Sequence, residues 1–485
     1  MKKKKETNKE EILNEPAVET SDEKKEDLVK ENTKEVKEPK KKEIPWQNIF
    51  NVISILFIVG CVIFYGYRLV KFYNIYNPKG EDGEKLVSLG AQVKLDNPVI
   101  SEGDGVYNID GNYVFKGLDV DNYVYYSDMM WRIVRVNKDD TVLLVSDEIV
   151  NNLIWSNGDK DYLKSDINLW LNSDGKNEHT GIFDRILNAK DKYLNKINLC
   201  VDEVNDLANI VCSDYKEVGY VGTLSITDYA NSVSTDSYIN NTEVLWLYNT
   251  SKDKVWNVFN GNITSSSSLE GYGVKATVTL KNNVVIVSGD GTLEKPYVIE
   301  KDTKDESLVG DYVDLNGDKW VIYEDNKDYM RLALDSLYDS GNTTYKFSNK
   351  NTAFDPESPY TLAYHLNNSI YRSFNYKDYI MNCDWYIGKY DTKENGYSYQ
   401  NVYTDKITAK VGLLNVADIK LNTKLSDYYF LTANTENKVY GFNNSTNLYA
   451  MRYTYMKSVR PAICISKDYK LSGEGTTTNP YKVGA

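Results

Sequence analysis

Two aspartates recur at matched places in this sequence, and a carboxylate of this kind can do chemistry on a ligand. Asp228 and Asp418 each close a block of the form Val-Gly-x-Leu-x-x-x-Asp. A carboxylate can act on a glycan as a general acid, a base or a nucleophile. It can also cap the start of a helix, which is the simpler interpretation. We therefore treat both as candidates for a ligand site and predict no catalytic residue.

A second matched pair is cationic. Lys275 stands in Val-Lys-Ala and Arg460 in Val-Arg-Pro, each before an apolar run. Either cation is able to contact an anionic ligand group. The following residues alternate as in a closing β-strand with one face inward, which favours a structural role. Both remain candidates for a ligand site.

The remaining residue types limit the chemistry. The chain has two histidines, His179 and His365, and five cysteines, with no zinc-ligand spacing among them. It contains no Asp-x-Asp-x-Asp-Gly calcium loop, no phosphate loop, no Gly-x-Ser-x-Gly and no His-Glu-x-x-His. We predict no cofactor and no metal, and we favour a non-enzymatic protein over an enzyme.

Four cysteines raise the question of disulfides. Cys200 and Cys212 flank a short loop, and we predict that they pair, because a disulfide is reasonable outside the cytoplasm. Cys383 and Cys464 match no cysteine pair in the first half of the chain. For these two, a disulfide and two free thiols both stay open.

The elements that must position these residues begin with an apolar run at 49–67, which contains no charged residue. A helix of roughly 20 apolar residues crosses a bilayer, so we predict a transmembrane helix over residues 46–71. A cleaved signal peptide would lie nearer the start. A lipidated Cys61 would be followed by polar residues, whereas the apolar run continues. An uncleaved anchor is therefore favoured.

Charge sets the orientation and excludes one class of partner. Three lysines at 40–42 outnumber Arg68 and Lys71 beyond the helix, which predicts a cytoplasmic N-terminus and an extracellular body in the cell membrane. Residues 1–45 are rich in Lys and Glu and predict a disordered tail. The net charge of −13 resides in the body, so nucleic acid is not an expected partner.

The body is a tandem repeat. Trp131-Arg-Ile-Val is matched by Trp320-Val-Ile-Tyr, and Ser-Gly-Asp-Gly-Thr at 288–292 by Ser-Gly-Glu-Gly-Thr at 472–476. We predict a linker at 72–104, module one at 105–300, a second linker at 301–309 and module two at 310–485. Alternating segments predict strands, including 223–226 and 275–280, and helical spacing predicts helices at 162–172, 181–194 and 360–371. The predicted fold class is α+β, with an antiparallel sheet in each module.

The order of these blocks resembles an uncharacterised ectodomain family of membrane-anchored surface proteins from low-GC Gram-positive bacteria. The resemblance covers residues 105–483 and includes the blocks WRIV, VGxLxxxD and SGDGTxxxPYVI. That family is similar in element order to C-type-lectin-like and formylglycine-generating-enzyme-like folds, which implies a scaffold with variable loops. The Glu-Pro-Asn and Trp-Asn-Asp calcium-lectin signatures are missing, as is the cysteine pair that binds copper in formylglycine-generating enzymes.

We expect a single-pass surface protein whose two modules bind an unknown extracellular protein or glycan, so that two weak contacts act together. One alternative is an extracellular enzyme that acts on cell-wall or glycan material through Asp228 or Asp418. A further alternative is a sensor that passes an external signal to the tail.

Overall fold

The computed structural model describes residues 57–61, 66, 87–240, 242–299, 307–392, 394, 396–421, 425–442 and 448–484. Contacts divide the chain into two compact units at Arg68, and the second unit contains both modules. The predicted tail lies outside the described residues, as does most of the predicted anchor, of which residues 57–61 and 66 are helical. Within the described ranges, no helix has the length and apolarity needed to span a bilayer.

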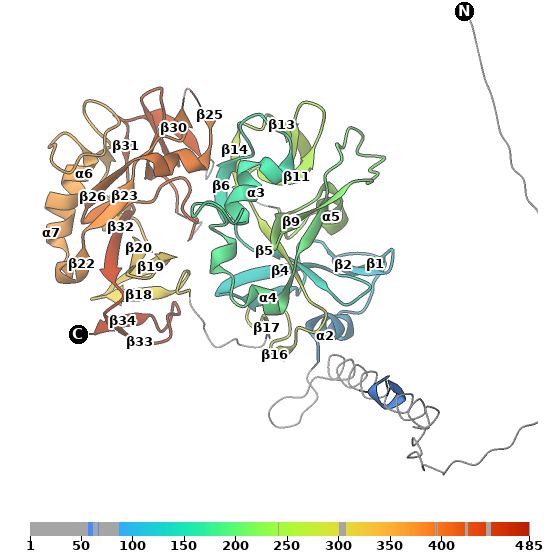
Figure 1. Ribbon diagram of the computed structural model, residues 1–485. Helices are drawn as coiled ribbons and strands as arrows, with labels where there is room; N and C mark the ends of the chain where they lie inside the picture. Colours follow the sequence, from blue (N-terminus) through green and yellow to red (C-terminus); the bar gives the residue numbers. More distant parts are fainter. Residues whose placement is uncertain are drawn as a thin grey trace, which may run out of the picture. The chain divides into compact units, whose positions relative to one another are not determined.

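Module one is built on a curled ten-stranded sheet (Figure 1). Its main path runs β10-β15-β5-β4-β3-β17-β16, with β1 and β2 beside β4 and β7 beside β15. Neighbouring strands are antiparallel except for β17 and β3. The strands are β1 (Gly105–Ile109), β2 (Asn112–Lys116), β3 (Tyr123–Tyr126), β4 (Met129–Val136), β5 (Val142–Ser146), β7 (Leu194–Asn195), β10 (Val221–Thr223), β15 (Ala276–Leu280), β16 (Ile286–Ser288) and β17 (Tyr297–Ile299).

A second sheet, a hairpin and short helices complete module one. The second sheet has the order β13-β12-β11-β14-β6, and β8 pairs with β9. These strands are β6 (Asn151–Ile154), β8 (Ile197–Cys200), β9 (Tyr215–Gly219), β11 (Leu245–Thr250), β12 (Val255–Phe259), β13 (Asn262–Ser266) and β14 (Gly271–Val274). The helices are α2 (Leu89–Asp96), η1 (Tyr162–Lys164), α3 (Asp166–Leu171), η2 (Asp184–Ile186), α4 (Lys190–Tyr193) and α5 (Ile226–Ser232).

Module two repeats the main path as β27-β32-β20-β19-β18-β34-β33, with β22 beside β32 as β7 lies beside β15. These strands are β18 (Tyr312–Leu315), β19 (Asp318–Asp325), β20 (Tyr329–Leu334), β22 (Ile380–Met381), β27 (Val411–Leu413), β32 (Pro461–Ser466), β33 (Lys470–Ser472) and β34 (Tyr481–Gly484). The predicted α+β class is confirmed, because both halves are mixed and dominated by sheet.

Shorter elements fill the rest of module two. A three-stranded sheet, β28-β29-β30, has the place of β11-β12-β13, and β23 pairs with β26. The strands are β21 (Tyr345–Lys346), β23 (Cys383–Tyr386), β24 (Asp391–Thr392), β25 (Gly396–Tyr397), β26 (Lys406–Ala409), β28 (Tyr429–Ala433), β29 (Lys438–Gly441), β30 (Tyr449–Arg452) and β31 (Met456–Lys457). The helices are η3 (Tyr338–Gly341), α6 (Leu362–His365), η4 (Leu366–Ile370), α7 (Tyr371–Ser373), η5 (Lys377–Tyr379) and η6 (Tyr399–Thr404).

One irregularity occurs twice. The β4–β5 register shifts between Ile133 and Arg135, and the β19–β20 register shifts between Ile322 and Glu324. A β-bulge of this kind redirects the side chains that follow it. Arg135 and Glu324 thus occupy equivalent, redirected positions, and both line cavities.

The two cores are also built alike. Trp131 of β4 and Trp320 of β19 are fully buried. Trp131 packs edge to face on Phe183 with ring centroids 6.3 Å apart, and Trp320 packs on Phe374 in the same way at 5.8 Å. Burial of such large rings contributes a major share of core stability, so the repeated tryptophan fixes each sheet against its helical layer.

Three predicted elements need correction. Residues 181–194 form the short η2 and α4 and end in the first residue of β7, with positive-φ residues at Gly181 and Ala189 that a continuous helix cannot include. The predicted strand 223–226 ends at β10, because Ser225 caps α5 by accepting the N–H of Asp228. The predicted linker 72–104 contains α2, whose Leu89 is buried in the core.

Described contacts join the two modules directly. The Trp170 indole N–H donates to the Ala417 carbonyl at 2.8 Å. Lys420 forms a buried ion pair with Glu243 at 3.2 Å, with the two side chains 3% and 5% exposed. Since a buried charge is stable only when it is paired, this ion pair ties the modules to one arrangement.

Candidate functional site

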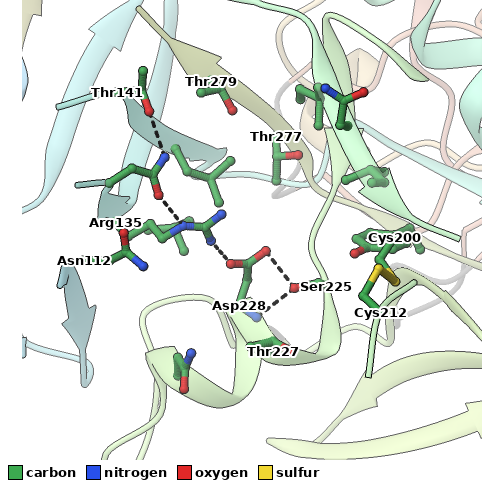
Figure 2. Close-up of a pocket in the computed structure, with 18 of the residues that line it drawn as sticks. Asn112, Arg135, Thr141, Cys200, Cys212, Ser225, Thr227, Asp228, Thr277 and Thr279 are labelled. Atoms are coloured by element: carbon green, nitrogen blue, oxygen red, sulfur yellow. Dashed lines mark hydrogen bonds and ion pairs between the residues drawn. A yellow bond between two sulfur atoms is a disulfide. The ribbon is translucent and has the colours of Figure 1, made fainter. Parts of the chain in front are cut away.

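The larger of the cavities described here belongs to module one and has a volume of about 860 Å³. It lies against β4, β5, β10 and β15, between the β1–β2 hairpin, α5 and the β8–β9 hairpin (Figure 2). Most of its polar lining consists of uncharged amide and hydroxyl side chains. These are Asn112, Asn137, Thr141, Asn195, Asn198, Thr223, Ser225, Thr227, Asn231, Asn249, Thr277 and Thr279.

A chain of hydrogen bonds crosses this cavity (Figure 2). Arg135 forms an ion pair with Asp228, and its Nε donates to Asn137 Oδ1 at 2.8 Å. Asn137 Nδ2 in turn donates to Thr141 Oγ1 at 2.9 Å. At the other end, the Ser225 hydroxyl donates to Asp228 Oδ2 at 2.7 Å. Both oxygens of Asp228 therefore have donors, so its carboxylate is held in a fixed, neutralised network and is poorly placed to act as an acid or base.

The sequence identified only part of this site. Asp228 is one of the predicted candidates, but the helix-capping interpretation is wrong for it, because Ser225 is the N-cap of α5 and Asp228 accepts the Ser225 hydroxyl. No described helix begins at Asp418 either. Arg135 is not among the predicted residues, because the β-bulge that redirects it leaves no local sequence signal. The positions of the lining threonines of β15 could have been predicted from the sequence. In β15, Thr277 and Thr279 alternate with the buried Val278, and strand alternation places both hydroxyls on one face.

A disulfide closes one side of the cavity. Cys200 and Cys212 are bonded, as are Cys383 and Cys464 in module two. Among the described residues, Cys200, Asp202 and Cys212 are grouped closely enough to suggest metal ligands. Because the two sulfurs are bonded to each other, they are not available as thiolate ligands.

The equivalent face of module two holds a second cavity, of about 690 Å³. Tyr323 and Glu324 stand where Val134 and Arg135 stand in module one, and Asp418 replaces Asp228. The remaining polar and aromatic lining differs in kind and includes Tyr329, Tyr386, Tyr403 and, from module one, His179, which stacks on Tyr403 with centroids 3.9 Å apart.

In module two the arginine lies on β20, the equivalent of β5, whereas Arg135 of module one lies on β4. Arg331 pairs with Cys464 across the sheet, as Leu143 pairs with Thr279 in module one. Its Nη1 donates to Glu324 Oε2 at 3.0 Å. The arginine thus neutralises the glutamate that replaced Arg135, and it does not form an ion pair with the aspartate.

Asp418, the counterpart of Asp228, has a different set of partners. Its Oδ2 accepts the Asn415 N–H at 2.7 Å, and no cation of the described residues forms an ion pair with it. Burial raises the pKa of Asp418 to about 7. The carboxyl therefore changes protonation near neutral pH, unlike an ordinary surface aspartate.

The other two candidates lie in neither cavity. Lys275 is buried, donates to the Asp147 carbonyl at 2.7 Å, and has its pKa lowered to about 8 by burial. Arg460 is buried and donates to the carbonyls of Leu334 and Leu421 at 2.8 and 2.7 Å. Each cation donates to a backbone carbonyl at or just after the end of an equivalent strand, β5 in module one and β20 in module two. These contacts support a structural role for both cations. The structure does not bring the four candidate residues together in one site.

No family model matches this chain, and no curated protein and no solved structure matches it either.

Proposed function

We propose that the chain is a single-pass surface protein whose body binds an extracellular ligand, and that the cavity of module one binds a neutral, hydroxyl-rich segment of a glycan. The observation that carries this proposal is the lining of that cavity: amide and hydroxyl side chains outnumber the charged ones and surround the Arg135–Asp228 ion pair. The other charged lining residues are Asp110, Asp139 and Lys196, of which Lys196 is paired with Glu217. Sugar hydroxyls both donate and accept hydrogen bonds, and so do these side chains.

Size and rigidity support the same ligand class. A volume of about 860 Å³ is in the range of small-molecule sites and accommodates a short oligosaccharide. The network from Thr141 to Ser225 fixes the polar groups before the ligand arrives. Preorganisation of this kind reduces the entropy that binding costs.

Location and fold are part of the proposal. Two disulfides are typical of proteins from oxidising compartments, and the apolar run at 49–67 is long enough to anchor the body in a membrane. The curled sheets with long connections are compatible with a C-type-lectin-like scaffold, which would present the cavity at a variable loop face.

The experiment is a glycan array with the full-length chain in detergent micelles. The test variant, Thr227→Val with Thr279→Val, removes two lining hydroxyls, neither of which hydrogen-bonds to a described residue. Thr477→Val is the matched control, because Thr477 is exposed and is not one of the lining residues. We expect the double variant to lose at least tenfold in affinity with unchanged melting temperature, and the control to bind normally. Absence of any glycan binding would refute the proposal.

One observation favours a second candidate function. Glu324 and Asp418 line one cavity, and a pair of carboxylates in one cavity is typical of glycoside hydrolysis. An extracellular enzyme acting on wall or glycan material would release reducing ends from the same array glycans. Product release that Asp418→Asn abolishes would establish this alternative.

A further inference from the structure

We propose that the cavity of module two is a second binding site, which holds the primary ammonium group of a ligand between Asp418 and the surrounding tyrosines. This site is separate from the cavity to which glycan binding is assigned. It rests on the cavity itself, one carboxylate without a cation, and one buried hydroxyl without a partner.

The charges of the cavity leave Asp418 as the place for a cation. Glu324 is paired with Arg331 and Asp325 with Lys467. At the rim, Glu178 is exposed, while Arg185 donates to backbone carbonyls of its own loop. Among the described lining residues, Glu178 and Asp418 are thus the carboxylates without an ion pair to Lys or Arg, and of these two Asp418 is the half-buried one inside the cavity.

A buried hydroxyl provides the second, independent observation. Tyr323 lines the cavity, is 5% exposed, and its hydroxyl has no hydrogen-bond partner among the described residues. Such a group normally has a partner, because a buried hydroxyl without a hydrogen bond is unfavourable. Asp418, Tyr323 and Tyr403 line the same cavity. A polar ligand group beside Asp418 would satisfy Tyr323.

Aromatic walls favour an organic cation over a metal ion. The rings of Tyr323, Tyr329, Tyr386 and Tyr403 line the cavity with the His179 imidazole, and aromatic faces attract ammonium groups. Calcium requires six to eight oxygen ligands and usually several carboxylates, whereas here Glu324 and Asp325 are already in ion pairs. An ammonium group needs one carboxylate and a few hydrogen-bond acceptors.

The ammonium can belong to an amino sugar or to a lysine side chain, and the probes distinguish the two sources. Full-length chain in detergent micelles is titrated calorimetrically at pH 7 with glucosamine, N-acetylglucosamine, Nα-acetyl-lysine amide and Nα-acetyl-norleucine amide. We expect at least one amine to bind tenfold more tightly than its neutral counterpart. A response to glucosamine identifies a sugar source, and a response to the lysine derivative identifies a peptide source. If neither amine binds, or if each binds no better than its neutral counterpart, the proposal is overturned.

Variants tie the binding to Asp418. Asp418→Asn keeps the acceptor for the Asn415 N–H and is expected to remove the preference for the amine, whereas Asp253→Asn, an exposed change in the β11–β12 turn, is expected to leave it intact. Retention of the preference in Asp418→Asn with an unchanged melting temperature would contradict the proposal. The Thr227→Val, Thr279→Val variant changes the module-one cavity and leaves the module-two cavity intact. Loss of glycan binding and loss of amine binding are therefore measured independently.

The pH dependence gives a further readout. With the pKa of Asp418 at about 7, affinity for the lysine derivative should fall about tenfold from pH 8 to pH 6 as the carboxylate is protonated. The charged groups that act on Asp418 are Glu324 from β19 and Arg331 from β20. Tyr323 from β19, Tyr403 from η6 and, from module one, Glu178, His179 and Arg185 line the same cavity. Asp418→Asn distinguishes titration of Asp418 from titration of His179, because this variant keeps His179 and should nevertheless lose the pH dependence of amine binding. A pH dependence that persists in that variant would contradict the assignment.

Discussion

The two modules use the same sheet face in opposite ways. In module one, the residue after the bulge is Arg135 and it neutralises Asp228. In module two, the residue after the bulge is Glu324, the cation stands on the neighbouring strand as Arg331, and Asp418 forms no ion pair with a described cation. Both modules thus keep the β-bulge and the large core rings, whereas the exchange of two charges decides whether the equivalent aspartate is paired with an arginine.

The disulfides follow the same division. In module one, Thr279 presents a hydroxyl to the cavity, whereas the equivalent position in β32 is Cys464, bonded to Cys383. Module one instead has its disulfide between Cys200 and Cys212, beside the cavity. Module two thus links its main sheet, through β32, to the β23–β26 pair, whereas module one cross-links the β8–β9 hairpin beside its cavity.

The largest effect is expected from removing the two disulfides in turn. The Cys383–Cys464 bond spans 81 residues and the Cys200–Cys212 bond spans 12. Loop-closure entropy predicts losses of about 4.5 kcal/mol and about 3 kcal/mol for the respective double Cys→Ser variants. Denaturant unfolding under non-reducing conditions measures both. A larger loss for the shorter loop would show that native-state contacts, and not loop length, set the difference.

The next effect tests the joint between the modules. Lys420→Met leaves Glu243 buried without its cation, and we expect a loss of about 3 kcal/mol in thermal or denaturant unfolding. Adding Glu243→Gln should restore most of that stability, because no unpaired charge then remains. Equal destabilisation by the single and double variants would mean that packing around Lys420, and not charge, holds the modules together.

A smaller effect is expected from pH at the same joint. Asp166 of α3 accepts the Ser398 hydroxyl at 2.8 Å, and burial raises the pKa of Asp166 to about 7. A carboxyl whose pKa is raised by folding stabilises the folded state while it is protonated, so this contribution is lost as pH rises from about 4 to 7. Asp166→Asn should remove about 2 kcal/mol of the decrease in stability between pH 5 and pH 7. If the stability of the wild-type protein and of Asp166→Asn, measured by thermal melting, changed equally between pH 5 and pH 7, this role of Asp166 would be contradicted.

The smallest effect comes from converting one cavity into the other. Glu324→Arg with Arg331→Leu reproduces the arrangement of module one, and the new arginine should pair with Asp418. We expect the amine affinity of module two to fall about tenfold, about 1.4 kcal/mol, with glycan binding unchanged. Calorimetric titration with Nα-acetyl-lysine amide checks this. Unchanged amine affinity would show that Asp418 does not provide the attraction.

Prediction from sequence succeeded where a signal repeats or alternates, and it failed where backbone geometry intervenes. Strand β15 was predicted as 275–280 because its residues alternate, and it runs over Ala276–Leu280. The helix expected at 181–194 is interrupted because Gly181 and Ala189 adopt positive φ. A resemblance to a surface-protein family and the membrane anchor remain predictions.

By itself, the sequence determined that the body is a mixed α+β structure, since alternation and helical spacing depend on neighbouring residues along the chain. It also marked Asp228 and Asp418 as equivalent. Only the tertiary structure decided that the first is paired with Arg135 and the second with no described cation, because the charges that surround a carboxylate come from strands distant in the sequence. A pairing of that kind depends on sheet register and on one repeated bulge.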